Sequence, residues 1–347
     1  MKFLRIVLVV FVFSSCNKKA EFVKAEIKLS EIDSLKTDEA IEGLIGNVDS
    51  LYKKIELRRI QDFQFDYGNV SKDSIFKCLA KREGVGFKFQ RADFDNNGFT
   101  DLLVVANNKT YTAENTTVDM EVEFSEEYNT VVLMNFGNNK YKLFDVSEEK
   151  YYWVIPKVVI EDSQAFLKVY KPKLYYTKER VKREESAATL TFKFGDFVEY
   201  NPKPVHYGIE KVEFYTRMCA GECPIFKINI SKDRKARMVA QHFNYSKFWS
   251  KGEYVEGGYS AEIKEKDFDD LCQLLCYIDF PNLKNDYRLP SSHHQDGTLK
   301  ITYNNGKVKT INDFGLVGTY GLKKVYDEFF KLRFNQEWKK NSVSKAL

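Results

Sequence analysis

The feature that most constrains this chain is a short apolar run close to its N-terminus. Residues 6–13 read IVLVVFVF, with Lys2 and Arg5 before them and the small residues Ser14 and Ser15 after them. A helix that crosses a bilayer needs about 20 apolar residues, so this run is too short to span a membrane. A basic start, an apolar core of this length and small residues behind it are typical of an export signal peptide. We therefore expect the rest of the chain to fold in water, outside the cytoplasm.

Cys16 follows the two serines directly, and the segment Phe-Ser-Ser-Cys resembles a bacterial lipobox, with Phe13 in place of the usual Leu. The resemblance implies that the Cys16 thiol is alkylated with diacylglycerol, that residues 1–15 are cleaved off, and that Cys16 becomes an acylated N-terminus carrying chains such as palmitate. Each buried methylene contributes about 0.8 kcal/mol, so several acyl chains hold a soluble body at a membrane. We expect an envelope lipoprotein of the outer membrane, facing the periplasm or the surface. Ordinary secretory cleavage near Ser15 is the alternative.

Charge and composition exclude several classes of protein. The 347 residues are 43% hydrophobic, with 18 glycines and 7 prolines, which excludes wholesale disorder and a collagen-like chain. Cleavage after Ser15 removes Lys2 and Arg5, so that 52 of the 54 basic side chains remain against 50 acidic ones. Nucleic-acid binding favours a concentrated basic surface, so this balance predicts no nucleic-acid partner. The expected partners are the membrane, through the lipid, and an unknown ligand or envelope protein.

The length predicts two domains, since a domain has about 150 residues. Residues 16–36 are polar without a sustained apolar face and are expected to form a tether. Residues 37–200 and 205–340 are the expected domains, and the two prolines of residues 201–204 mark the boundary. We predict an α+β fold in which each domain is a mainly antiparallel sheet with packed helices.

In the expected N-terminal domain, apolar residues recur at helical spacing from residue 37 to residue 60, and Thr37 or Asp38 is suited to cap the start. A second helix is predicted over 71–81, with Cys78 turned inward. Strand signals follow, and the charged run 178–187 is expected to be a solvated loop or helix face. The predicted strands are 101–106, 130–134, 141–146, 152–160, 165–170 and 189–200.

In the expected C-terminal domain, strands are predicted first, followed by a helix over 265–278, a hairpin and a last helix from Tyr320. The sequence Asn304-Asn305-Gly306 is a strong signal for a tight hairpin turn. The predicted strands are 211–215, 225–230, 236–241, 298–303 and 307–311.

One loop carries oxygen ligands at alternate positions, with Gly98 at the sixth position for a sharp turn. Alternate residues of a tight loop can converge on one calcium ion, which takes six to eight oxygens. Position 12 is Val104, where an EF-hand has Glu, so the loop instead resembles the short calcium loops of FG-GAP propeller repeats, although it occurs once here. Calcium is the one cofactor we expect, and a polar turn chosen for its backbone angles is the alternative. The candidate ligands are Asp93, Asp95, Asn97, Phe99 through its carbonyl, and Asp101.

The segment Cys219-Ala-Gly221-Glu-Cys223-Pro224 leads into a predicted strand, and Asp313-Phe-Gly315 follows later. With these motifs, residues 209–335 resemble a family of exported bacterial domains of unknown function. The resemblance implies a fold unit and no reaction.

Cysteines in an oxidising compartment tend to pair, and the C-x3-C spacing most simply closes a Cys219–Cys223 disulfide. The chain-entropy estimate for so short a loop is about 2 kcal/mol. The alternatives are a redox-active pair, a four-thiolate zinc site with Cys272 and Cys276, or cross-links between the two pairs. Cys78, Cys272 and Cys276 are otherwise expected to be small, mostly buried hydrophobes.

No Gly-rich phosphate loop, H-E-x-x-H helix or G-x-S-x-G elbow occurs in the sequence. We therefore expect a non-catalytic binding or interaction module and assign no catalytic residue. The alternative is an envelope hydrolase that uses Asp296 or Asp313 with His293 or His294, because histidines beside an acid can move protons. The commoner explanation for the two histidines is a polar loop.

Overall fold

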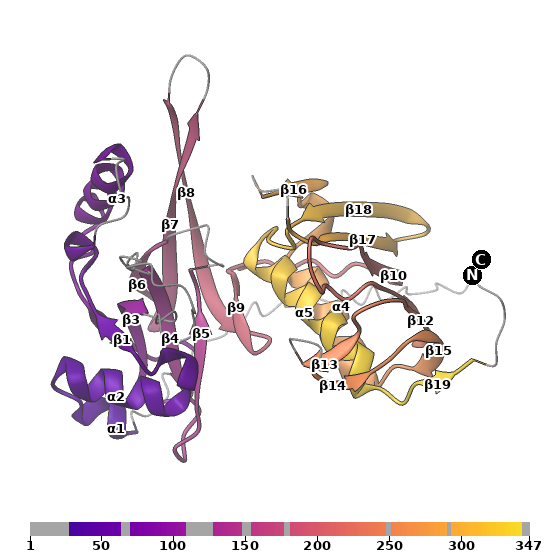
Figure 1. Cartoon of the computed structure of the whole chain (residues 1–347), viewed down its shortest axis with the longest axis horizontal. Coiled ribbons are helices and arrows are strands. Elements are labelled where there is room, and N and C mark those ends of the chain that lie inside the picture. The colour runs from indigo at the N-terminus through magenta and orange to yellow at the C-terminus, as the bar shows by residue number, and fades with distance from the viewer. Residues whose placement is uncertain are drawn as a thin grey trace, which may run out of the picture.

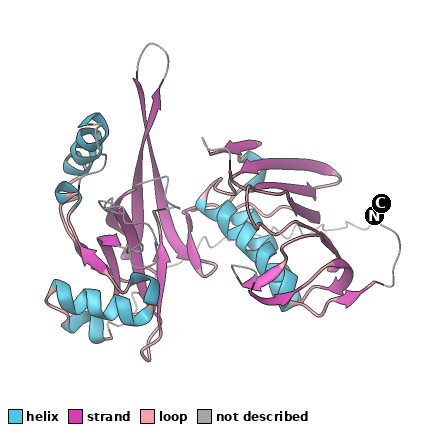
Figure 2. Ribbon diagram, in the orientation of Figure 1, coloured by secondary structure: helices cyan, strands magenta, loops and turns pink. Residues whose placement is uncertain are grey.

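The computed structural model confirms an α+β protein (Figures 1 and 2). It describes residues 28–63, 70–108, 128–147, 154–176, 181–247, 251–289 and 293–341. Cys16, the predicted signal peptide and most of the predicted tether lie outside these ranges. Among the described helices, none combines the length and the apolar character needed to cross a bilayer.

The N-terminal half is built on a five-stranded antiparallel sheet whose central strand is buried from end to end. This strand is β3, and it carries apolar residues on both faces because both faces are covered. Ile41 and Ile45 of the helices pack on one face, and a second sheet packs on the other. The elements are α1 (Glu31–Ser34), α2 (Asp38–Val48), β1 (Ile55–Leu57), β2 (Phe89–Ala92), β3 (Asp101–Asn108), β4 (Tyr128–Asn135) and β5 (Tyr141–Asp145).

The second sheet has four antiparallel strands, so this half contains two stacked sheets where a single sheet was predicted. Leu167 and Leu190 of the second sheet share a core with Leu103 and Met134 of the first. The two longest strands, β7 and β8, form a hairpin that extends well beyond the rest of the sheet in Figure 1. The strands are β6 (Ile155–Glu161), β7 (Gln164–Tyr176), β8 (Val181–Lys193) and β9 (Asp196–Glu199).

The charged run 178–187 is not a loop or a helix where it is described. From Val181 onward it belongs to β8 and pairs with β7, for example Ser186 with Lys171. A strand of a projecting hairpin can carry charged residues because its backbone hydrogen bonds are satisfied by the partner strand. Residues 177–180 lie outside the described part of the chain.

The helix predicted over 37–60 is shorter than expected. Thr37 caps it as predicted, accepting a hydrogen bond from the Ala40 amide at 3.3 Å, but α2 ends at Val48. The extended backbone of Asp49 stops the helix, and its side chain accepts from the Leu51 amide at 3.0 Å. The later apolar residues of the predicted helix lie in two short 3-10 turns, η1 (Ser50–Tyr52) and η2 (Ile60–Asp62), and in strand β1.

Two details of the N-terminal half differ from the prediction. The folded body begins before Thr37, because Lys28 bridges to Phe99 and Ile32 is fully buried, so residues 28–36 are not a free tether. Helix α3 (Val70–Arg82) forms as predicted, but Cys78 is exposed and not inward. The buried residues of α3 include Phe76, Leu79 and Ala80, which share one helix face and leave Cys78 on another.

The C-terminal half is an eight-stranded sheet with two helices packed on one face (Figure 1). All neighbouring strands are antiparallel except β16 and β18. Thr319 caps the last helix by accepting from the Leu322 amide at 3.2 Å. In sheet order the strands are β16 (Asp286–Arg288), β18 (Lys307–Phe314), β17 (Asp296–Tyr303), β10 (Ile209–Thr216), β11 (Phe226–Ser231), β12 (Lys235–Ala240), β15 (Gly257–Glu262) and β19 (Lys339–Lys340). The remaining elements are a hairpin of β13 (Tyr245–Lys247) and β14 (Lys251–Tyr254), helices α4 (Glu265–Tyr277) and α5 (Tyr320–Asn335), and the 3-10 turn η5 (Phe280–Asn282).

The central strands β10, β11 and β12 alternate buried residues with outward-facing ones. Val212 and Phe214 of β10 are buried under the helices, whereas Lys211 and Glu213 point the other way. We call the side of the sheet opposite to α4 and α5 the outer face. It carries Lys211, Glu213, Tyr215, Lys227, Asn229, Ser231, Lys235, Arg237, Val239, Ser260, Glu262, Asp286, Arg288, Asp296, Thr298, Lys300, Thr302, Val308, Thr310, Asn312 and Lys339.

The two halves touch at the start of α5. The Glu199 carboxylate at the end of β9 accepts from the Tyr320 and Gly321 amides at 2.8 and 2.9 Å. The Tyr320 hydroxyl donates to the Val146 carbonyl at 2.9 Å. A carboxylate is favourable at a helix N-terminus because the amides there lack partners within the helix. Residues 201–204 connect the halves in irregular structure, and the division into two domains stays a prediction.

Candidate functional site

The acidic loop between β2 and β3 brings three of its predicted ligands together. One carboxylate oxygen from each of Asp93, Asp95 and Asp101 lies within 4.8 Å of the others. Asp101 opens β3 and is fully buried, and the two other carboxylates are partly buried. Gly98 has a positive φ of 88°, the left-handed conformation that a sharp turn requires and that glycine adopts readily.

Backbone amides hold these carboxylates in place. Asp93 accepts from the Asn97 and Gly98 amides at 3.0 and 2.8 Å. Asp101 accepts from the Phe94 amide at 2.8 Å and from the Asn135 amide at 2.7 Å. The loop conformation therefore fixes the oxygens before any ligand binds.

Asn97 is differently engaged. Its Oδ1 accepts from the Phe99 amide at 2.7 Å, and its Nδ2 donates to Asp95 at 3.0 Å and to the Asn135 carbonyl at 2.9 Å. This amide braces the loop, and for its oxygen to bind a cation together with the three carboxylates, the side chain has to turn.

The electrostatics of the loop favour a cation. Burial raises the pKa of Asp101 to about 8. Burial and the charge of Asp93 raise the pKa of Asp95 to about 6. Among the described residues none of the three carboxylates forms an ion pair, and the nearby Lys28 ammonium donates instead to the Asn97 carbonyl at 3.1 Å. Three crowded oxygen ligands without a basic partner fit a hard divalent cation such as calcium.

The Cys219 and Cys223 sulfurs are bonded at 1.98 Å, as the spacing predicts. Because each sulfur is committed to the other, the four-thiolate zinc site and the cross-links to Cys272 or Cys276 are not formed. Strand β11, and not a helix, follows the pair, whereas redox-active pairs are typically followed by a helix.

Cys272 and Cys276 lie on α4 and are free thiols, with Cys276 buried and Cys272 partly buried, much as predicted. Cys276 accepts a hydrogen bond from the Tyr207 amide at 3.4 Å. Burial raises the pKa of Cys272 to about 12 and also raises that of Cys276. Both are therefore protonated at neutral pH and poor nucleophiles.

The residues of the alternative hydrolase are only partly brought together. Asp296 and Asp313 both line a hollow of about 220 Å³ at the edge of the sheet, but His293 and His294 do not line it. Asp296 lies 3.5 Å from the Arg217 guanidinium. The backbone carbonyl of His293 instead contacts the disulfide loop, 3.5 Å from the Ala220 amide.

Asp313 is fully committed to structural hydrogen bonds. It accepts from the Val317 amide at 3.2 Å, the Gly318 amide at 2.7 Å and the Tyr326 hydroxyl at 3.0 Å. Burial raises the pKa of this carboxyl group. The side chain joins the end of β18 to α5 and the loop between them, which is the role of a structural residue.

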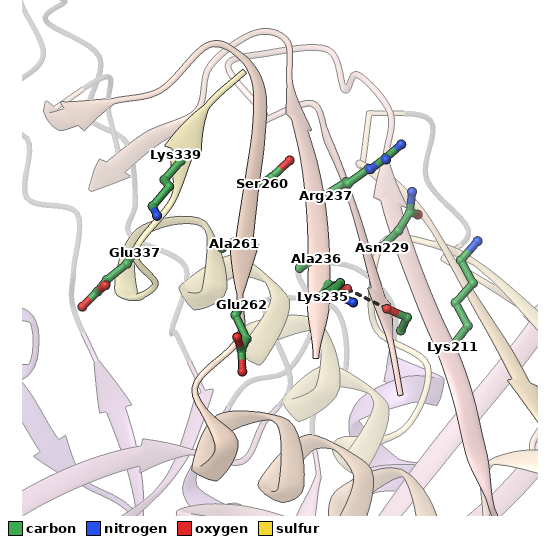
Figure 3. A pocket seen from close by; sticks show the side chains of 11 residues that line it. Lys211, Asn229, Lys235, Ala236, Arg237, Ser260, Ala261, Glu262, Glu337 and Lys339 are labelled. Atoms are coloured by element: carbon green, nitrogen blue, oxygen red, sulfur yellow. Dashed lines mark hydrogen bonds between the residues drawn. The ribbon is translucent and has the colours of Figure 1, made fainter. Parts of the chain in front are cut away.

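The outer face contains a larger hollow, of about 810 Å³, that the sequence did not predict as a site (Figure 3). Its floor is formed by β11, β12 and β15, and its lining contains no aromatic side chain. The sequence feature that could have indicated this surface is the alternation of polar and apolar residues in these strands, for example Lys235 and Arg237 on either side of the buried Ala236. The lining residues are Lys211, Asn229, Ser231, Lys235, Ala236, Arg237, Ser260, Ala261, Glu262, Glu337 and Lys339.

Comparison with known proteins identifies one part of the chain. No curated protein and no solved structure matches the chain. A family model described as a domain of unknown function (DUF6438) matches residues 210–333. This range begins in β10 and ends in α5, so it covers most of the eight-stranded sheet and both helices. The C-terminal part of the chain is thus similar to an uncharacterised domain family, as predicted from its motifs, and this family has no assigned activity.

Proposed function

We propose that this chain is a lipid-anchored envelope protein that works as a non-catalytic binding or interaction module. The lipobox-like sequence that ends at Cys16 supports the anchor. The observation that carries the binding role is the outer face of the eight-stranded sheet. Both helices cover one side of this sheet, and the other side exposes charged and polar residues around the 810 Å³ hollow (Figure 3).

The same proposal assigns calcium a structural role in the N-terminal half. Asp93, Asp95 and Asp101 would hold the ion, and its charge would offset the repulsion among the carboxylates. The loop lies between β2 and β3, so a bound ion would stabilise the start of the most buried strand of that half.

Binding is favoured over hydrolysis because the two acids of the alternative hydrolase, Asp296 and Asp313, already have partners within the fold. Asp313 accepts three hydrogen bonds from the surrounding fold, and Asp296 pairs with Arg217. A general acid or base needs a free position toward its substrate, within hydrogen-bond reach of the reacting group.

Residue-specific photocrosslinking in intact cells tests the binding role. A photoreactive amino acid at Ser260, on the outer face, is expected to give a crosslinked species. The same amino acid at Gln273, exposed on α4 on the opposite side, is the matched control and is expected to give none. Equal labelling from both positions, or none from Ser260, would contradict the assignment of the outer face.

A further inference from the structure

The outer face has an excess of positive charge. Its strands present seven basic side chains and four acidic ones, Glu213, Glu262, Asp286 and Asp296. Glu337, just before β19, adds a further carboxylate at the margin of the hollow. The basic side chains are Lys211, Lys227, Lys235, Arg237, Arg288, Lys300 and Lys339. The chain as a whole is nearly neutral, so this excess is a local property of one surface.

The acidic residues neutralise only part of this charge. Glu213 lies 2.9 Å from the Lys211 ammonium and 4.0 Å from those of Lys227 and Lys300, so one carboxylate serves three lysines. At the end of the same strands, Lys235 pairs with Asp233 at 2.7 Å, and Glu262 pairs with Arg234 at 2.5 Å.

Two cations at the hollow have no carboxylate partner among the described residues. These are Arg237, in the middle of the sheet, and Lys339, at its edge. In Figure 3 both are drawn at the hollow, with Ser260 between them. Exposed cations without partners are available to an anionic ligand at little desolvation cost.

The charged groups form a row across the strands. Strand pairing places Lys300 opposite Glu213 and Asn229 beyond it, then Arg237, Ser260 and Lys339 in the same register. Neighbouring strands lie about 4.8 Å apart. Lys300 and Arg237 are therefore about 14 Å apart, and Arg237 and Lys339 about 10 Å, measured along the sheet. A ligand that meets all three must be extended and carry repeated negative charges.

The groups between the cations indicate the chemistry of that ligand. Asn229 and Ser260 offer an amide and a hydroxyl in the row, and Ser231 lies beside them, so neutral polar groups can be hydrogen-bonded. The lining has no aromatic residue, which argues against stacked nucleobases and against a typical protein interface. It also has no large apolar side chain to insert into a bilayer. A linear glycan with spaced acidic groups and hydroxyls between them fits best.

We infer that the outer face binds a linear anionic glycan, lying across the strands from Lys300 through Arg237 to Lys339, an inference that rests on the proposed binding role. The acidic groups of the glycan meet the three cations, and its hydroxyls meet Asn229 and Ser260.

Titration of the purified full chain in detergent with a heparin-derived decasaccharide tests this. Saturable binding that weakens with added salt is expected for the unaltered chain. The double variant Arg237→Glu with Lys339→Glu is expected to bind about tenfold more weakly or worse. The control is Lys54→Glu with Lys203→Glu, which changes the net charge equally at exposed positions away from the outer face and is expected to bind like the unaltered chain.

Three results would overturn the inference. The first is no binding of the decasaccharide by the unaltered chain at low salt. The second is equal loss in the control variant, which would mean that only net charge matters. The third is tighter binding of single-stranded DNA or of phosphatidylglycerol vesicles, lost in the Arg237 and Lys339 variant alone, which would assign the face to another class of ligand. Because the photocrosslinking test detects any bound macromolecule, a crosslink from Ser260 without glycan binding would reject the glycan and keep the binding role.

Discussion

Calcium added to the calcium-free chain is expected to raise its melting temperature by several degrees. For one site with a dissociation constant of about 10⁻⁴ M, as in calcium modules outside the cell, about 10 mM calcium stabilises the folded state by about 2.7 kcal/mol. The physical reason is the crowding of Asp93, Asp95 and Asp101, whose oxygens lie within 4.8 Å of one another without a basic partner among the described residues. Thermal unfolding followed by circular dichroism, in chelator and in calcium, measures the shift.

The substitution Asp95→Ala separates a calcium site from a polar turn. The variant is expected to lose most of the calcium-dependent shift but to be no less stable than the unaltered chain in chelator, because burial and the neighbouring Asp93 disfavour its charge. Glu161→Ala removes an exposed carboxylate at the end of β6 and should keep the full shift. If calcium leaves the melting temperature of the unaltered chain unchanged, the loop is a turn that is stable without an ion.

The second large effect is expected from Asp313→Ala, which should lower the free energy of unfolding by about 3 kcal/mol. The substitution leaves the Val317 and Gly318 amides and the Tyr326 hydroxyl without their shared acceptor in a buried setting. A buried donor without a partner costs about 1–3 kcal/mol, so losing all three at once is severe even if the groups relax toward water. Urea unfolding of the full chain, followed by tryptophan fluorescence, gives the measurement.

The matched variant for this prediction is Tyr326→Phe. It removes one of the three donors and leaves the carboxylate in place, so the free energy of unfolding is expected to fall by about 1 kcal/mol. An Asp313→Ala chain as stable as the unaltered one would mean that the carboxylate is not structural, and the hydrolase alternative would regain one of its acids.

The elements that could be predicted carry their own local signal. Asn304, Asn305 and Gly306 all adopt positive φ, and these residue types do so readily. The turn of the β17–β18 hairpin could therefore be predicted from the sequence. The apolar run at the start of β3 predicted a buried strand because both of its faces are covered. Thr37 predicted the start of a helix because its side chain accepts a hydrogen bond from the Ala40 amide, which has no acceptor within the first turn of the helix.

The elements that were mispredicted depend on partners far along the chain. Ile55 continues the helical spacing of α2, yet it lies in β1 and pairs with Asn108 of β3. The charged residues of β8 form a strand because β7 lies beside them. Local composition cannot report such pairing, since it depends on tertiary structure.

One candidate site is also local in sequence, whereas the other is assembled from strands that are far apart in the chain. The three carboxylates of the acidic loop are close in sequence, so spacing alone predicted that they meet. The outer face is assembled from strands between Lys211 and Lys339, and only the strand order brings Lys300, Arg237 and Lys339 into one row. The sequence could show that each strand turns a polar side outward, but not which strands are neighbours.

Lipidation of Cys16 is the claim from which the envelope location follows, and one measurement tests it directly. Bacteria producing the full chain are fed an alkyne-bearing fatty acid, and the chain is then coupled to a fluorophore and fractionated. We predict a labelled chain in the membrane fraction and no label on the Cys16→Ser variant. An unlabelled chain that stays in the cytosol, with Cys16 intact, would contradict the proposed anchor and the envelope setting together.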